Sequence, residues 1–122
     1  MEYNKDFLEL VTDNIKEGIT ISDFGGNFLL YNKAMENITG YSYEELSEID
    51  FPAVLYPDPE YREKAFAAIE SAFLNKDANN QLWKITRKDG ENRWVLISST
   101  KIEHQGVPMI LGSVRDITEL KK

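Results

Sequence analysis

Three short apolar runs separated by turns fill the last third of the chain, and they restrict the fold more than any other feature. The runs cover residues 82–86, 94–98 and 109–114, and the turns between them contain Gly90 and Gly106. β-Branched and aromatic residues recur in the runs, and such residues favour strands. Because strands joined by short turns pair with each other, the sequence predicts an antiparallel meander here.

A hairpin is predicted near the other end of the chain. Residues 18–23 alternate apolar and polar side chains, and the Gly25-Gly26 pair separates them from the apolar residues 28–31. Two such segments joined by a glycine-containing turn are typical of a β-hairpin.

An amphipathic helix is predicted before the hairpin. Apolar residues recur at every fourth position from Tyr3 to Ile15, and polar or charged residues occupy most of the other positions. This spacing gives a helix one apolar face. Gly18 is placed to end the helix.

Capping signals place further helices in the middle of the chain. Asn32 can cap a short helix that Gly40 ends, and residues 42–45, Ser-Tyr-Glu-Glu, have the spacing of a capping box. Asp58, which precedes a proline, begins the longest predicted helix, and this helix runs to about Leu74. Strands on both sides of this helical block indicate an α+β fold rather than a wound parallel sheet.

Length, charge and cysteine content exclude several classes of protein. The 122 residues suffice for one hydrophobic core, and the net charge of −7 opposes binding to nucleic acid. The chain has no cysteine, no apolar stretch of the roughly 20 residues that a membrane span needs, and no export signal at its N-terminus. We therefore expect a single cytoplasmic domain without direct membrane insertion.

No combination of residues predicts catalysis. The sequence has no phosphate-binding glycine-rich loop with a lysine, no spaced set of metal ligands, and no nucleophile paired with a histidine base. We expect that the domain itself is not an enzyme and binds no metal.

Five short motifs occur in an order that resembles the PAS family. None of them is specific alone, but chance seldom places all of them in this order, and the match covers nearly the whole chain. The motifs are Asn32 after the second strand, Gly40-Tyr41-Ser42 with Glu45-Leu46, Arg87-Lys88-Asp89-Gly90, Trp94, and Gly112-Ser113-Val114-Arg115-Asp116-Ile117-Thr118.

The resemblance implies a sensory module within a longer signalling protein. It implies a five-stranded antiparallel sheet in the spatial order 2-1-5-4-3, with flanking helices on one face and a ligand cavity between them. Residues 1–17 would form the N-terminal helix, residues 18–118 the PAS domain, and residues 119–122 the start of a linker. The linker would lead to an output domain such as a histidine kinase or a diguanylate cyclase.

Alternation along the strands, taken in the register of the family, selects the residues that would face a small apolar or weakly polar ligand. Apolar side chains at this spacing are equally typical of a filled core, so both interpretations stay open. Ser99 and Gly112 are small and favour space inside. The expected ligand-binding residues are Phe66, Ile69, Glu70 and Phe73 of the long helix and Trp83, Ile85, Val95, Ile97, Ser99, Ile110, Gly112 and Val114 of the strands.

The opposite face of the sheet would expose large apolar side chains unless another element covers it. We expect the N-terminal helix to cover it, either on its own sheet or across a symmetric homodimer, and the dimer is favoured. The residues expected to pack there are Phe7, Leu8, Val11 and Ile15 of the helix and Leu82, Trp94 and Leu96 of the strands.

Asp116 and Thr118 follow the last strand, where the chain of a PAS domain leaves the sheet. Their short side chains can bind backbone groups and close a local turn. The resemblance adds a role for both residues in relaying a signal to the output domain.

The resemblance also bears on cofactors. Light-sensing members of the family use a flavin that a cysteine attacks, and haem-binding members use a histidine on or near the long helix. This chain has no cysteine, and its one histidine, His104, is predicted in a turn, so covalent flavin and haem are disfavoured. Noncovalent flavin, on which Trp83 could stack, is also disfavoured, because Ile85, Val95 and Val114 stand where flavin-binding relatives often present amides.

Two other functions compete with small-molecule sensing. One is a ligand-independent dimerisation or partner-docking module with a filled core. The other, which the sequence favours least, is a flavin or haem redox sensor, and either cofactor would colour the purified protein.

Overall fold

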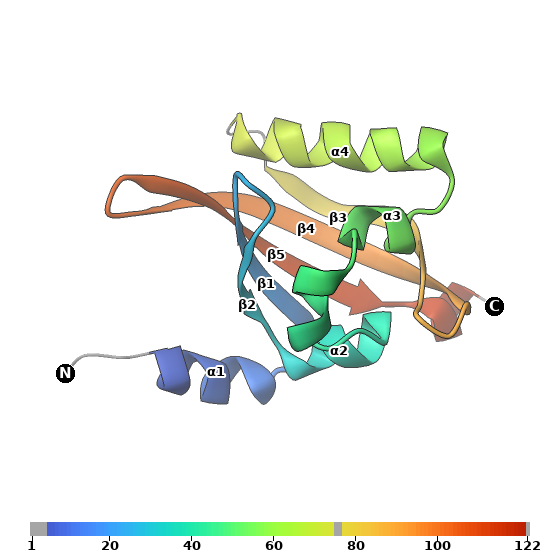
Figure 1. The fold of residues 1–122 in the computed structure, drawn as a ribbon, viewed down its shortest axis with the longest axis horizontal. Coiled ribbons are helices and arrows are strands. Elements are labelled where there is room, and N and C mark those ends of the chain that lie inside the picture. Colours follow the sequence, from blue (N-terminus) through green and yellow to red (C-terminus); the bar gives the residue numbers. More distant parts are fainter. Residues whose placement is uncertain (1–4, 75–76, 122) are drawn as a thin grey trace.

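The computed structural model describes residues 5–74 and 77–121, and it shows an antiparallel sheet with helices beside it (Figure 1). The five strands have the spatial order β2-β1-β5-β4-β3, which confirms the predicted order. Along the chain the elements are α1 (Lys5–Asp13), β1 (Gly18–Asp23), β2 (Phe28–Tyr31), α2 (Lys33–Thr39), the 3-10 helix η1 (Glu44–Glu48), α3 (Phe51–Leu55), α4 (Pro59–Phe73), β3 (Ala78–Thr86), β4 (Asn92–His104), β5 (Val107–Asp116) and the 3-10 helix η2 (Thr118–Lys121).

The helices are distributed unevenly around the sheet. Helix α4 runs over the strands at the β3 side and contacts β4 and β5, whereas α1 lies at the other side of the molecule and contacts α2 (Figure 1). The hydrophobic core is built from α2, α3 and strands β2, β3, β4 and β5, and its most deeply buried members include Val95, Ile85, Met35 and Leu55.

Helix α1 is shorter than the sequence predicted. It ends at Asp13, so the predicted end at residue 17 is too late; the predicted start at residue 1 lies outside the described residues. The side-chain amide of Asn14 donates to the carbonyl oxygen of Leu10 at 2.7 Å. This bond satisfies a carbonyl of the last turn, which is what a helix end requires.

Gly18 does not end the helix, contrary to the prediction. It is the buried first residue of β1. A Cβ atom there would lie 2.4 Å from Sδ of Met35, so the missing side chain allows α2 to pack closely on the strand.

The buried side chain of Asn32 does more than cap α2. Its Oδ1 accepts hydrogen bonds from the backbone N–H groups of Met35 (3.1 Å) and Ile19 (2.8 Å). Its Nδ2 donates to the carbonyl oxygens of Thr12 (2.8 Å) and Glu17 (3.0 Å). One amide thereby joins α1, β1 and α2.

The predicted capping signals are confirmed. Gly40 ends α2 in the left-handed conformation, with φ of 80°. The backbone N–H of Ser42 donates to Glu45 Oε1 at 2.9 Å, and the N–H of Glu45 donates back to Ser42 Oγ at 3.3 Å, which completes a capping box. Asp58 caps α4 by accepting from the N–H of Glu60.

Helix α3 was not predicted. It has five residues, which is too short for a helical period to be recognised. The available signal was its start, because Asp50 accepts from the N–H of Ala53 and Pro52 stands in the first turn.

The strands of the meander are longer than the predicted apolar runs. Strand β4 pairs with β5 along its whole second half, up to the pair of His104 and Val107. Gln105 and Gly106, both with positive φ (52° and 79°), form the turn between them. A two-residue turn of this kind keeps strands paired to their ends, so polar residues outside the apolar runs also join the sheet.

Candidate functional site

A cavity of about 410 Å³ lies between the inner face of the sheet and helices α3 and α4. Exposed residues of the β1–β2 turn, including Phe24 and Gly25, border it together with Phe66 and Ile69 of α4. The cavity therefore opens to solvent between the turn and the helix. Its volume falls in the range of about 300–1,000 Å³ that is usual for small-molecule sites.

The structure brings together the residues expected to bind a ligand, with one exception. All of them border the cavity except Glu70, which is exposed on α4 and points elsewhere. The buried Ala65 and Ala72 mark the side of α4 that faces the sheet, and Glu70 lies too far around the helix from that side. That the other residues bind a ligand stays a prediction.

The two ends of the cavity differ in burial. Val95 and Ile85 on its floor are 0% and 3% exposed, whereas Phe66 and Ile69 on α4 are 49% and 47% exposed. These two large apolar side chains border the cavity, and the described residues leave about half of each exposed. The space beneath α4 is therefore open, unlike the closed core beneath α2 and α3.

Several residues of the cavity wall were missed by the sequence analysis. Thr20 and Ser22 of β1 border it, although polar residues of an alternating strand usually face solvent. The alternation showed that these two residues share a face, but it did not show that this face is the inner one. The remaining members come from the β1–β2 turn, β2, the helices and the edge of the sheet: Asp23, Phe24, Gly25, Gly26, Phe28, Met35, Thr39, Phe51, Pro52, Leu55, Tyr56, Ala65, Ala68 and Gln81.

Gly112 has a different reason for being small than the one expected. A Cβ atom at this position would lie 2.7 Å from Oγ1 of Thr20, its direct partner on β1. The absent side chain thus makes room for the threonine as well as for the cavity.

An aromatic group surrounds Trp83 beside the cavity. The rings of Tyr56 and Tyr61 lie 6.0 and 5.4 Å from the indole, and both approach it at steep angles. The Tyr61 hydroxyl also accepts from the N–H of Lys84 at 2.8 Å, which fixes its ring against β3. Burial raises the pKa of the Tyr56 hydroxyl, so it is uncharged at neutral pH.

Two arrangements of the N-terminal helix were expected, one on the outer face of its own sheet and one across a dimer. The first is not found, because the helix does not cover that face. Leu8, Val11 and Ile15 of this segment are 48%, 45% and 40% exposed, and Phe7 is also exposed. On the outer face Leu82 is exposed, while Trp94 and Leu96 are half-buried.

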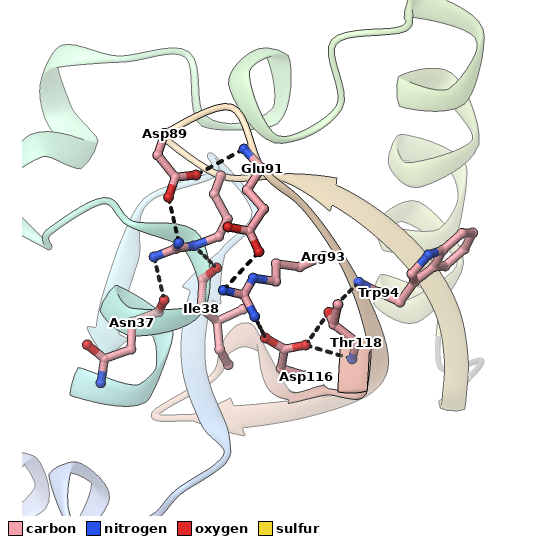
Figure 2. Close-up of polar contacts among 9 residues, drawn as sticks. Asn37, Ile38, Asp89, Glu91, Arg93, Trp94, Asp116 and Thr118 are labelled. Carbon is pink, nitrogen blue, oxygen red and sulfur yellow. Dashed lines mark hydrogen bonds and ion pairs between the residues drawn. The ribbon is translucent and has the colours of Figure 1, made fainter. Parts of the chain in front are cut away.

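Asp116 and Thr118 form a compact junction at the end of β5 (Figure 2). The N–H and Oγ1 of Thr118 donate to Asp116 Oδ1 at 2.9 and 2.6 Å, and the N–H of Trp94 donates to Thr118 Oγ1 at 3.0 Å. Arg93 lies 3.5 Å from the other carboxylate oxygen of Asp116. The exit of the chain from the sheet is thereby fixed to the start of β4, next to Val95 of the cavity floor.

Residues 5–74 and 77–121 contain neither a cluster of metal ligands nor a helix that could span a membrane. His104 is exposed at the end of β4 and does not border the cavity. The described residues contain no group of three or more histidine, cysteine or acidic side chains placed to hold a metal ion. None of the helices described is long and apolar enough to cross a lipid bilayer.

Residues 16–119 match the family model described as a PAS domain. No curated protein matches the chain. A solved PAS domain of a protein from Colwellia psychrerythraea is similar, with 24% identity, a TM-score of 0.75 and coverage of 93% of this chain and 99% of that one.

Two further solved structures are similar. One is a domain of a sensory box sensor histidine kinase/response regulator from Geobacter sulfurreducens, with 23% identity, a TM-score of 0.71 and coverage of 93% and 97% of the two chains. The other is the LOV domain of a blue-light activated histidine kinase from Erythrobacter litoralis, with 22% identity, a TM-score of 0.66 and coverage of 86% and 99%. At these identities the similarity establishes a shared fold.

Proposed function

Since this chain belongs to the PAS domain family, we propose that it is the sensory module of a signalling protein, and that a small molecule in its cavity changes the activity of an output domain. The exposed apolar surface of Phe66 and Ile69 carries this proposal. A filled core would bury these side chains, whereas a bound ligand would cover them. We assign no catalytic role to the domain.

The relay would follow β4 and β5 to the junction of Asp116 and Thr118. Val95 and Val114 border the cavity, and the junction binds the backbone of the neighbouring Trp94. A change at the cavity floor would therefore shift the direction in which the chain leaves β5. Similarity to domains of two histidine kinases supports an output domain of that kind, in the cytoplasm, after a linker that begins near residue 119.

We propose that the ligand is neither haem nor a flavin, whether the flavin is bound covalently or noncovalently. The sequence has no cysteine for a flavin adduct, and His104 lies away from the cavity. Trp83, which could have stacked on a flavin, instead contacts the edges of two tyrosine rings. A yellow or red purified protein would contradict this assignment.

A second function, ligand-independent dimerisation or partner docking, is favoured by a different observation. The apolar residues Leu8 and Val11 of α1 are exposed, and an exposed amphipathic helix suits a protein interface. Both functions can operate in one molecule, because no described residue of α1 borders the cavity.

Ligand binding is tested by a thermal-shift screen of the chain against a metabolite library, with native mass spectrometry to detect molecules that co-purify. A ligand at about one hundred times its Kd stabilises the folded state by about 2.7 kcal/mol, which raises Tm by several degrees. We expect a selective hit or a co-purified small molecule.

Two alanine positions of α4 locate the site of any hit. Ala68 borders the cavity, whereas Ala67 is exposed on the other side of the helix. Ala68→Phe should fill the cavity and abolish the shift in Tm, while Ala67→Phe should preserve it. If no compound binds and no molecule co-purifies, ligand-independent dimerisation or partner docking explains the domain better than ligand sensing does.

A further inference from the structure

The floor of the cavity carries a polar strip that crosses three neighbouring strands. Thr20 of β1 pairs directly with Gly112 of β5, and Gly112 pairs directly with Ser99 of β4. All three border the cavity. Two hydroxyl groups therefore flank a glycine, and Oγ1 of Thr20 lies where the side chain of that glycine would begin.

The hydroxyl groups of this strip have no hydrogen-bond partner within residues 5–74 and 77–121. This holds for Thr20 and Ser99 and also for Ser22, the next inward residue of β1. By contrast, Ser98 on the other face of β4 accepts from the N–H of Asn80 at 2.9 Å. Inward hydroxyl groups that the protein itself does not use are suited to bind a polar group of a ligand.

The face of β1 that borders the cavity is its polar face. Its apolar residues Ile19 and Ile21 pair with Ser113 and Leu111 on the outer face, while Thr20 and Ser22 point inward. Packing alone would favour the reverse arrangement. The inward polar side of β1 thus belongs to the cavity and adds nothing to the hydrophobic core.

The charges around the cavity disfavour an anionic ligand. Lysine, arginine and histidine are absent from the described residues that border it. Asp23, at the rim, accepts from the N–H and the side-chain amide of Asn27 at 2.9 and 3.3 Å. The backbone hydrogen bond from Asn27 lowers the pKa of Asp23, so this carboxylate is ionised at neutral pH. A buried anion would lack a counter-charge and would meet a like charge at the mouth.

The remainder of the floor is apolar. Ile85, Val95 and Val114 lie beyond the polar strip, and Met35 and Leu55 face them from α2 and α3. A ligand that satisfied the whole surface would have a polar group at one end and an apolar body at the other.

We propose that the cavity binds an uncharged amphiphilic molecule, whose hydroxyl, carbonyl or amide group lies against the hydroxyl groups of Thr20 and Ser99 and whose apolar body reaches toward Val95. This inference deepens the proposed sensory function and rests on it. The cavity discriminates against carboxylates and phosphates of the same shape.

The test uses the neutral fluorescent probe N-phenyl-1-naphthylamine on the whole chain, with displacement by 1-octanol or by octanoate. The probe should bind saturably, and 1-octanol should displace it at concentrations at least about tenfold lower than octanoate. Octanoate is also more soluble in water than 1-octanol, and this difference alone would weaken its binding. The variant Gln81→Lys separates the two causes, because it places a positive charge at the rim of the cavity. It should restore displacement of the probe by octanoate. The inference that the cavity disfavours anions would be overturned by either of two results. In the first, octanoate displaces the probe as well as 1-octanol does. In the second, Gln81→Lys does not improve displacement by octanoate.

The polar strip is tested by the double variant Thr20→Val/Ser99→Ala. It should weaken 1-octanol by about tenfold, as expected for the loss of two neutral hydrogen bonds, and leave the affinity of the probe nearly unchanged. Thr100→Val, on the opposite face of β4, is the matched control and should change neither. Equal affinity of 1-octanol for the double variant and the wild type would overturn the position of the head group. If the probe itself fails to bind, the cavity is closed in solution, and the proposed sensory function fails rather than its refinement.

Discussion

Single residues set the shape of the cavity floor. Gly112 is buried, and the Oγ1 atom of Thr20 occupies the space where its side chain would begin. The two residues act as a pair, because the threonine can point inward only while position 112 lacks a Cβ atom. The size of one residue thereby controls the placement of a hydroxyl group on the neighbouring strand.

Gly112→Ala should destabilise the fold by about 1–3 kcal/mol, since overpacking of this size forces a side chain or backbone to move. In the Thr20→Ala background the same substitution should cost much less, because the clashing oxygen is gone. Urea unfolding of the four proteins gives the coupling free energy between the two positions. An equal loss in both backgrounds would show that Thr20 is not the cause.

Pairs of elements are joined by side chains that bind helix ends. Arg87, after β3, donates from Nε to the carbonyl of Ile38 at 3.1 Å and from Nη2 to the carbonyl of Asn37 at 3.0 Å (Figure 2). It also forms an ion pair with Asp89 in the same turn. These bonds satisfy carbonyl groups at the end of α2, where a positive charge also complements the helix dipole. The β3–β4 turn and α2 therefore move as one unit.

Arg87→Lys should reduce the free energy of unfolding by about 1–2 kcal/mol, because lysine cannot span both carbonyl groups and the aspartate. Arg115→Lys is the matched control, since Arg115 is largely exposed and, among the residues that the structure describes, binds Glu17 alone. It should change stability by less than about 0.5 kcal/mol. Chemical denaturation of both variants measures the difference, and equal effects would contradict a role for Arg87 in joining the two elements.

At the scale of the whole molecule, the uncovered apolar side chains of α1 are the main unsatisfied feature. Leu8 and Val11 are about half exposed, and Leu82 on the outer face of the sheet is exposed to a similar degree. Contact between two copies of the chain would bury both surfaces at once. A dimer of this kind stays a prediction, and it would connect the cavity of one subunit to the other.

Leu8→Glu/Val11→Glu should shift the chain from dimer to monomer, because charged side chains cannot be buried unpaired in an apolar interface. Leu74→Glu is the control: Leu74 is 66% exposed at the end of α4, away from α1 (Figure 1). Sedimentation equilibrium over a range of concentrations measures the change. A wild-type chain that stays monomeric at all concentrations would remove the dimer from the mechanism.

The sequence by itself determined the local structure and the grouping of residues on faces. Caps at Asn32, Ser42 and Asp58 and the turn glycines act over a few residues, so they could be identified without a fold. Alternation along β3, β4 and β5, taken in the register of the PAS family, selected all the cavity residues that these three strands contribute except Gln81, because side-chain direction in a strand has a period of two.

Only the tertiary structure decided which face is inside and how far each helix stands from the sheet. The polar side of β1 faces the cavity, α1 rests beside α2 instead of covering the sheet, and Glu70 turns away from the ligand space. Each of these outcomes depends on what a distant element offers as a packing surface. Residue spacing encodes the relation between neighbours in the chain, whereas the position of a helix over a sheet follows from the total apolar area that all the elements bury together.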